Sequence, residues 1–303
     1  MKKKCIASIF CLLLSLPLFA QVEVEVEVVN VYVSVTDTKG HFIKDLKPED
    51  FILKEDGVEQ TVTHFSNFAE EKSDKLGEKD VPLTVAFVVD TSESMAVTIS
   101  DQPKIDIVKD AAFRVIDELR PEDQMMLIAF NKIPTEVTPL TSNKKQFSKD
   151  LLFQGVEGGN TALLDSIYFA LEKIKSQFGR KIIIVCSDGD DTASYLKLEE
   201  VLSNVIASDA TILAFGTMEL GSGSLRGRFL LEEMAKASGG YAFFPTSLKS
   251  LKEVMDQLKQ SMRSQYSLGY TPKKGSDGTW RRLEVLCKRP GVKLRYRQGY
   301  YAK

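Results

Sequence analysis

Between positions 81 and 262, segments with a strand-like pattern of hydrophobic residues take turns along the chain with segments that have a helical pattern. Residues 83–89 are apolar without alternation, which is typical of a parallel strand buried on both faces. Residues 105–119 carry apolar side chains at helical spacing instead. The same patterns predict strands at 125–130, 182–186, 210–215 and 241–244, and helices at 161–174, 198–206, 229–237 and 248–262. Repeated strand–helix units predict an α/β fold with a doubly wound, mostly parallel sheet.

Two zones that resemble β-structure flank this region. Residues 22–28 alternate Val and Glu with period two, and the phase then shifts by one residue, which predicts a bulge or a change of sheet. Residues 51–62 read as a hairpin closed by Asp56-Gly57. Residues 263–303 return to strand-like alternation with two turn signals. The charged, aperiodic stretch 70–80 reads as a linker.

The two flanking zones carry opposite charge. Residues 21–80 contain seven Lys and Arg against fifteen Asp and Glu, and residues 263–303 contain eleven against two. We expect segments 21–69 and 263–303 to pair into one small β-domain; the alternative is a polyanion-binding tail. Aromatic residues of the tail are expected in the core of that domain rather than on a binding surface: Trp280, Tyr266, Tyr270, Tyr296, Tyr300 and Tyr301.

The first twenty residues resemble a secretory signal. Three lysines after Met1 precede the apolar stretch 6–19, and Ala20 offers a small residue for cleavage. The stretch is short for a membrane span, although an uncleaved anchor is the alternative. We therefore expect an exported protein, in the periplasm, at the cell surface or in the medium, with no transmembrane segment after signal removal.

Overall charge and cysteine content exclude some functions. A formal net charge of −2 gives no general attraction to nucleic acid or anionic membranes. Beyond the predicted signal only Cys186 and Cys287 remain, and the apolar strand around Cys186 favours a free core thiol over a disulfide. Two cysteines and two histidines give no zinc-site spacing.

Oxygen-bearing side chains follow two predicted strands and open one helix. Asp90, Ser92 and Ser94 follow strand 83–89, Asp188 follows strand 182–186, and Thr161 follows a Gly-Gly turn. Ligand sites of parallel sheets lie at the carboxyl ends of strands, so the five side chains can converge. Carboxylate and hydroxyl oxygens suit Mg²⁺, with Mn²⁺ or Ca²⁺ possible, and an open position can accept a partner's carboxylate.

A plainer interpretation exists for each of these residues. Asp, Ser and Thr all favour helix N-caps, although capping does not require both serines together with Asp90. Asp190 and Asp191, which follow Asp188, are expected to be solvated loop charges.

The order and spacing of these motifs resemble a known family. Asp90-Thr91-Ser92-Glu93-Ser94, then Thr161, then Asp188-Gly189 resemble the metal-ion-dependent adhesion site of von Willebrand factor type A domains. The resemblance covers about residues 81–262 and implies a Rossmann-like fold and divalent-metal-dependent protein binding. It implies that Ser92, Ser94 and Thr161 contact the metal, with Asp90 and Asp188 bound directly or through water. The chain ends resemble, less specifically, a bacterial von Willebrand A-related group, in Asp50-Phe51 with Glu55-Asp56-Gly57 and in Leu268-Gly269-Tyr270 with Gly299-Tyr300-Tyr301.

These features together predict an exported binding protein that is not an enzyme. It engages a protein partner through an acidic side chain at a Mg²⁺ site. One alternative is a structural or assembly module in which the metal only staples loops. The other is a metal-assisted hydrolase, but the sequence has no G-x-S-x-G motif and no histidine near the site loops.

Overall fold

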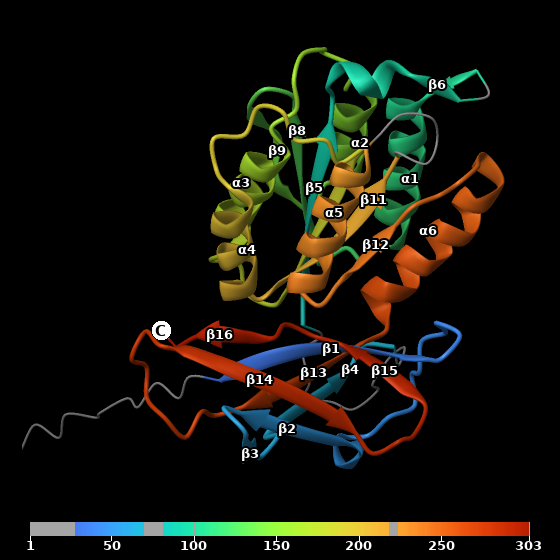
Figure 1. Ribbon diagram of the computed structural model, residues 1–303. Coiled ribbons are helices and arrows are strands. Elements are labelled where there is room, and N and C mark those ends of the chain that lie inside the picture. Colours follow the sequence, from blue (N-terminus) through green and yellow to red (C-terminus); the bar gives the residue numbers. More distant parts are fainter. Residues whose placement is uncertain (1–27, 70–80, 100, 218–223, 303) are drawn as a thin grey trace, which may run out of the picture.

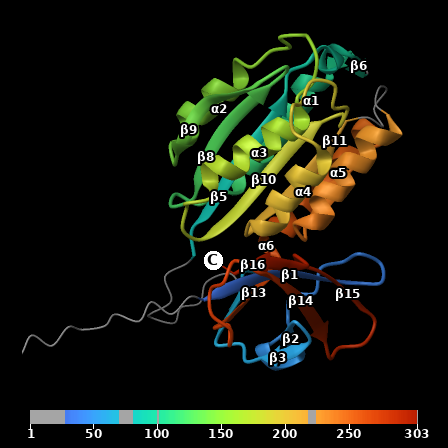
Figure 2. The same ribbon diagram turned by 60° about the vertical axis from the view of Figure 1, so that its left-hand side comes forward.

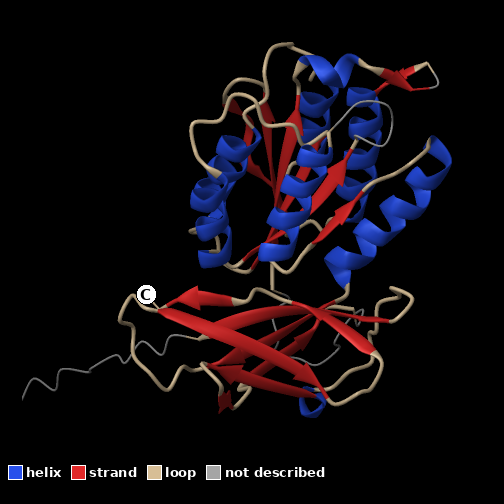
Figure 3. Ribbon diagram, viewed as in Figure 1, coloured by secondary structure: helices blue, strands red, loops and turns tan. Residues whose placement is uncertain are grey.

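The computed structural model describes residues 28–69, 81–99, 101–217 and 224–302. The predicted signal at 1–20, the Val-Glu repeat up to residue 27 and the predicted linker at 70–80 lie outside this part of the chain. An α/β unit and a β-sandwich lie one above the other (Figure 1). Helices occur almost entirely in the first and strands dominate the second (Figure 3).

A six-stranded sheet forms the centre of the α/β unit. Five strands are mutually parallel, and the sixth, β9, pairs antiparallel at one edge. The order is β12 (Tyr241–Phe243), β11 (Ala210–Gly216), β10 (Arg180–Ser187), β5 (Leu83–Asp90), β8 (Gln124–Phe130) and β9 (Pro134–Thr141). The predicted α/β class with a mostly parallel sheet is therefore confirmed.

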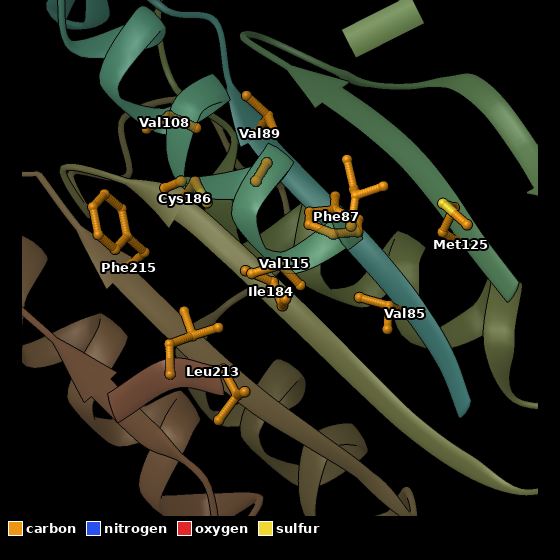
Figure 4. Close-up of a cluster of buried hydrophobic side chains, with 14 of the residues drawn as sticks. Val85, Phe87, Val89, Val108, Val115, Met125, Ile184, Cys186, Leu213 and Phe215 are labelled. Carbon is orange, nitrogen blue, oxygen red and sulfur yellow. The ribbon is translucent and has the colours of Figure 1, made fainter. Parts of the chain in front are cut away.

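Helices cover both faces of this sheet (Figure 2). Val85, Phe87 and Val89 of β5 join the core on one face (Figure 4), whereas Ala86 and Val88 join the core on the other. The first face packs against α1 (Lys104–Glu118), α2 (Lys144–Leu152) and α6 (Leu248–Arg263). The second packs against α3 (Leu163–Ile174), α4 (Leu198–Ala207) and α5 (Leu225–Ala237). Double coverage explains the unbroken apolar run of β5.

Strand β9 and helix α2 were not predicted from the sequence, and neither was the short hairpin of β6 (Thr98–Ile99) and β7 (Gln102–Pro103). β9 is an edge strand with two prolines, and Thr138 is its one fully buried residue, so it lacks an apolar pattern. α2 is short and polar and buries only Phe147 and Leu151. Short elements at the edge of a sheet bury little surface and leave a weak periodic signal.

The β-sandwich combines both ends of the chain in each of its sheets. Strand β1 (Val29–Asp37) pairs antiparallel with β13 (Gln265–Tyr270) and β15 (Val292–Arg295). Strand β14 (Trp280–Cys287) pairs with β2 (Phe51–Glu55). The remaining strands are β3 (Val58–Gln60), β4 (His64–Asn67) and β16 (Gly299–Tyr301). The predicted small β-domain is thus formed by N- and C-terminal segments.

Opposite charges of the two ends meet across the sandwich. Arg289 Nη1 lies 2.7 Å from Asp45 Oδ1, and Lys274 Nζ lies 2.8 Å from Asp56 Oδ2. Asp56 and Gly57 have positive φ values of 49° and 80°, as expected for the two central residues of the β2–β3 hairpin.

The aromatic residues of the tail divide between core and surface. Tyr266, Tyr270 and Tyr300 are buried as expected. The expectation was wrong for Trp280 and Tyr301, which are 38% and 40% exposed and pack edge-to-face at a centroid distance of 5.2 Å. Both belong to the outward-facing register of the paired strands β14 and β16. Cys186 is buried, Cys287 is half-buried, and both thiols are free.

Arginine side chains join the sandwich to the α/β unit. The Arg180 guanidinium donates to the Met262 carbonyl and to Gln265 Oε1, the latter at 2.8 Å, and lies 4.1 Å from the centroid of the Phe68 ring. Arg297 donates to the carbonyls of Ser208 at 3.1 Å and Asn30 at 2.8 Å. Strand β13 also follows α6 almost directly, so the two parts share a polar, buried joint.

We expect Arg180→Ala to lower the free energy of unfolding by about 2–4 kcal/mol, because it removes a ring contact and two hydrogen bonds to buried acceptors. Urea denaturation measures the loss. Arg228→Ala is the matched control, since Arg228 stacks on Phe244 but pairs with Glu232 at the surface. If Arg180→Ala lowers the free energy of unfolding no more than Arg228→Ala does, the contacts of Arg180 between the two units do not matter for stability.

Candidate metal centre

The predicted site residues lie at the end of the sheet that faces away from the β-sandwich (Figure 1). Strands β5 and β10 are parallel neighbours, and the helices that follow them, α1 and α4, cover opposite faces. Such a divergence opens a crevice at the carboxyl ends of the two strands. Asp90 is the last residue of β5, and Asp188 follows the last residue of β10.

Asp90 is fully buried and held by two donors. Its Oδ1 accepts from the Ser92 amide at 2.9 Å and its Oδ2 from the Ser187 hydroxyl at 2.6 Å. Burial raises the pKa of Asp90 to about 6, with these hydrogen bonds opposing the shift. The Ser92 and Ser94 hydroxyl oxygens lie 3.3 Å apart in the short 3-10 turn η2 (Glu93–Ala96) and its N-cap.

The loop containing Thr161 packs on the turn after Asp90. The Glu157 and Gly158 amides both donate to the Thr91 carbonyl, at 2.8 and 3.2 Å. Gly158 and Gly159 have φ values of 78° and 82°, a conformation that favours glycine. The Thr161 carbonyl in turn accepts from the amides at positions 192 and 193 of the β10 loop. Backbone hydrogen bonds therefore tie all three predicted loops together.

Helix capping does not account for the hydroxyls. Ser92 is the N-cap of η2 and Ala162 is the N-cap of α3, and neither makes a side-chain capping hydrogen bond. Thr161 lies outside α3 and is 6% exposed, and its backbone amide donates to Thr192 Oγ1 at 3.0 Å. The hydroxyls of Ser92 and Thr161 therefore do not serve as helix caps.

The loop after β10 is fixed by close backbone contact. Gly189 has φ of 84°, and a Cβ there would lie 2.3 Å from the Gly227 carbonyl oxygen in the first turn of α5. Only glycine allows this approach. Asp188 is 1% exposed, and its Oδ1 is buried without a hydrogen-bond partner among the described residues. Leaving a buried carboxylate oxygen unpaired is costly, so the position suits a cation ligand.

The next two aspartates correct an expectation. Asp190 and Asp191 are half-buried rather than solvated. Asp190 accepts from the hydroxyl of Ser224, the N-cap of α5, and Asp191 accepts from the Ser194 hydroxyl at 2.5 Å and the Leu164 amide at 3.3 Å. Their carboxylates shape the loop through bonds to neighbouring elements, which composition alone does not indicate.

Sequence reasoning missed Lys104 altogether. This first residue of α1 has a fully buried side chain, and its Nζ lies 3.6 Å from Asp188 Oδ2. Burial lowers the pKa of Lys104, while Asp188 and Asp90 oppose that shift. A lysine next to a helix start normally reads as a solvated charge. The one hint in the sequence is that Lys104 stands at the start of a helix, where the helix dipole disfavours a positive charge.

The residues present fit a hard divalent cation. Two buried carboxylates, two closely spaced serine hydroxyls and Thr161 supply oxygen atoms only. Within the described ranges no group of three or more His, Cys, Asp and Glu has the arrangement of a metal site.

Fold and site together define an α/β domain with a polar, oxygen-lined crevice at its switch point. The sequence profile of the von Willebrand factor type A domain matches residues 84–257, more than half of the chain. The chain belongs to this family, as the motif resemblance predicted.

Curated relatives match about half of the chain. The chain is 27% identical to human inter-alpha-trypsin inhibitor heavy chain H4 over 174 residues, which is 54% of the chain and 18% of that protein. It is 29% identical to human heavy chain H3 over 175 residues, 19% of that protein. The chain thus spans less than a fifth of the length of these relatives. The family match and the relatives indicate a protein-interaction domain and no enzymatic family.

Solved structures support the fold. One is proximal thread matrix protein 1 from the mussel byssus with a zinc-occupied MIDAS motif, at TM-score 0.53 and 21% identity, covering 64% of this chain and 48% of that one. Another is a von Willebrand factor type A protein from Catenulispora acidiphila, at TM-score 0.50 and 16% identity, covering 74% and 56%.

We expect the metal-free protein to lose stability as pH rises through about 6. Folding raises the pKa of Asp90 from 3.8 to about 6, so the folded state binds this proton more tightly than the unfolded state. Between about pH 5 and about pH 8, the titration of Asp90 should lower the free energy of unfolding by about 1.4 kcal/mol. Denaturation in the presence of a chelator measures this difference.

Asp90→Asn should remove that pH dependence, because the amide does not titrate. Asp209→Asn should retain it, since Asp209 pairs with Lys181 at the opposite end of the sheet. An unchanged pH profile in Asp90→Asn would show that another group is responsible.

Proposed function

We propose that this chain is an exported binding protein whose type A domain holds Mg²⁺ and engages an acidic side chain of a protein partner. The observation that carries the proposal is the buried, unpartnered Oδ1 of Asp188 beside the Asp90–Ser92–Ser94 cluster. Export rests on the signal-like residues 1–20. Among the described residues no helix is long and apolar enough to cross a membrane.

Each residue has a role in this proposal. Ser92, Ser94 and Thr161 would contact the metal through neutral hydroxyls, with Asp90 and Asp188 bound directly or through water. Neutral ligands leave the cation electron-poor, which favours an added anionic ligand. When bound, the cation supplies electrostatic attraction for a carboxylate. The chain's own contribution is to hold these oxygens on three loops joined by backbone hydrogen bonds.

Exposed apolar side chains near the site support a protein partner. Ile133 follows β8, Tyr195 lies in the loop after β10, and Leu225 begins α5 after β11; they are 62%, 90% and 89% exposed. These residues follow the carboxyl ends of parallel strands, and so lie at the same end of the sheet as Asp90. Large exposed aromatic and aliphatic residues around a polar centre are typical of interaction surfaces.

The alternative is a metal that only staples the loops. Backbone hydrogen bonds already join the loops at residues 91, 157–161 and 192–193. Because the loops are held together without a cation, this alternative is less favoured. A partner that requires metal, Ser94 and Thr161 for binding would favour the adhesive role. A metal-assisted hydrolase lacks a histidine, since His41 and His64 both belong to the β-sandwich region.

Titration calorimetry of Mg²⁺ and Mn²⁺ into the chelator-stripped protein is the direct test. We expect one site per chain, and at least about tenfold weaker binding in Asp90→Ala and in Thr161→Ala, because each removes an oxygen ligand. Asp209→Ala is the control, since it deletes a carboxylate at the far end of the sheet.

Equal Mg²⁺ and Mn²⁺ binding by the wild type and both site variants would sink the proposal, because the metal would then sit elsewhere. Absence of binding in the wild type, with or without acetate as a stand-in for the partner's carboxylate, would have the same consequence.

A further inference from the structure

Lys104 places a positive charge inside the proposed metal centre. Its side chain is 0% exposed and its Nζ lies 3.6 Å from Asp188 Oδ2, on a carboxylate side chain that is itself 2% exposed. The carboxylates of Asp90 and Asp190 also act on it electrostatically. The Lys104 backbone is fixed as well, because its amide donates to the Val97 carbonyl at 3.0 Å.

Three physical costs oppose a lysine at this position. Burial removes the ammonium group from water, the N-terminus of α1 repels positive charge, and a long side chain loses rotamer freedom. The next residues of the helix, Ile105, Ile107 and Val108, are buried apolar side chains. An apolar residue at position 104 would therefore avoid all three costs. Attraction to the carboxylates of the site offsets these costs.

We infer that Lys104 is a built-in counter-charge of the metal centre, which weakens binding of the divalent cation alone and makes it depend on an anionic ligand. The inference rests on the proposed metal function and deepens it.

The charges of the site explain this dependence. Among the side chains proposed as metal ligands, Asp90 and Asp188 contribute two negative charges, and Lys104 beside them contributes one positive charge. A divalent cation changes the sum from −1 to +1, whereas without Lys104 the loaded site would be neutral. A buried site with excess positive charge is unfavourable until a carboxylate from a partner arrives. Lys104 thereby links the binding of the metal to the binding of the acidic ligand.

The same charge stabilises the metal-free protein. Two carboxylates buried in one crevice repel each other, and Lys104 offsets that repulsion when no cation is bound. The protein can then fold before metal is available. Removing the lysine should shift this balance, so that the metal-free state becomes less stable and the metal-loaded state becomes easier to form.

Lys104→Met tests the inference, because methionine is apolar and close to lysine in length. We expect the variant to bind Mn²⁺ at least about tenfold more tightly than wild type in calorimetry, since a repulsive charge is gone. Its midpoint of thermal unfolding in chelator should fall. Lys109→Met is the matched control: it removes a lysine from the same helix, one that pairs with Asp106 at 3.2 Å.

Acetate gives a second measurement that a merely structural lysine would not affect. Replacing chloride with acetate at equal ionic strength should tighten Mn²⁺ binding in the wild type and in Lys109→Met. The improvement should be several-fold smaller in Lys104→Met, whose loaded site has no excess charge.

The outcomes separate this inference from the proposed function. If wild type binds Mn²⁺ and Lys104→Met binds it no more tightly, the inference is wrong and the metal site stands. If neither protein binds Mn²⁺, with or without acetate, the proposed function fails and the inference fails with it. Lys104→Gln, which keeps a hydrogen-bond donor for Asp188 without the charge, should reproduce the gain in affinity. If neither variant folds even in Mn²⁺, Lys104 is structural and the inference is overturned.

Discussion

The burial of two carboxylates at the ends of adjacent strands is the constraint on which the rest of the site depends. β5 is covered on both faces, so Asp90 enters a crevice with little water, and its raised pKa records that cost. Asp188 occupies the equivalent place after β10 with one oxygen unpaired. Unpaired buried charge is expensive, and the fold balances it with donors, with Lys104 and, in the function we propose, with a metal.

Loop geometry determines which atoms reach that crevice. The glycines at 158, 159 and 189 adopt positive φ values, and Gly189 also permits backbone contact with α5. The loops then share hydrogen bonds through the carbonyls of Thr91 and Thr161. Serine and threonine hydroxyls have few rotamers, so a fixed backbone fixes their oxygen atoms. Preorganisation of this kind lowers the entropy cost of binding a cation or a partner.

The sequence predicted the elements that are long and buried, and it missed those whose position depends on contacts with other parts of the chain. The apolar runs of β5 and β10 and the helical spacing of α1 gave correct elements with boundaries shifted by one or two residues. β9 and α2, at the sheet edge, bury too little to leave a pattern. Two of the site motifs could be placed at strand ends and the third before a helix. The burial of the Lys104 side chain could not be predicted, because side-chain burial at a helix start has no periodic signal.

The β-sandwich lies at the end of the sheet opposite to the candidate metal site and leaves that site uncovered. The sandwich is joined to the end of the sheet at which the parallel strands begin. Arg180 is the first residue of β10, and Arg297 donates to the carbonyl of Ser208, two residues before β11. The carboxyl end of the sheet, with Asp90 and Asp188, therefore faces away from it (Figure 1). In the function we propose, an acidic side chain of a partner can therefore approach Asp90 and Asp188 from the end of the sheet that the β-sandwich does not cover, while Arg180 and Arg297 hold the two units together at the other end.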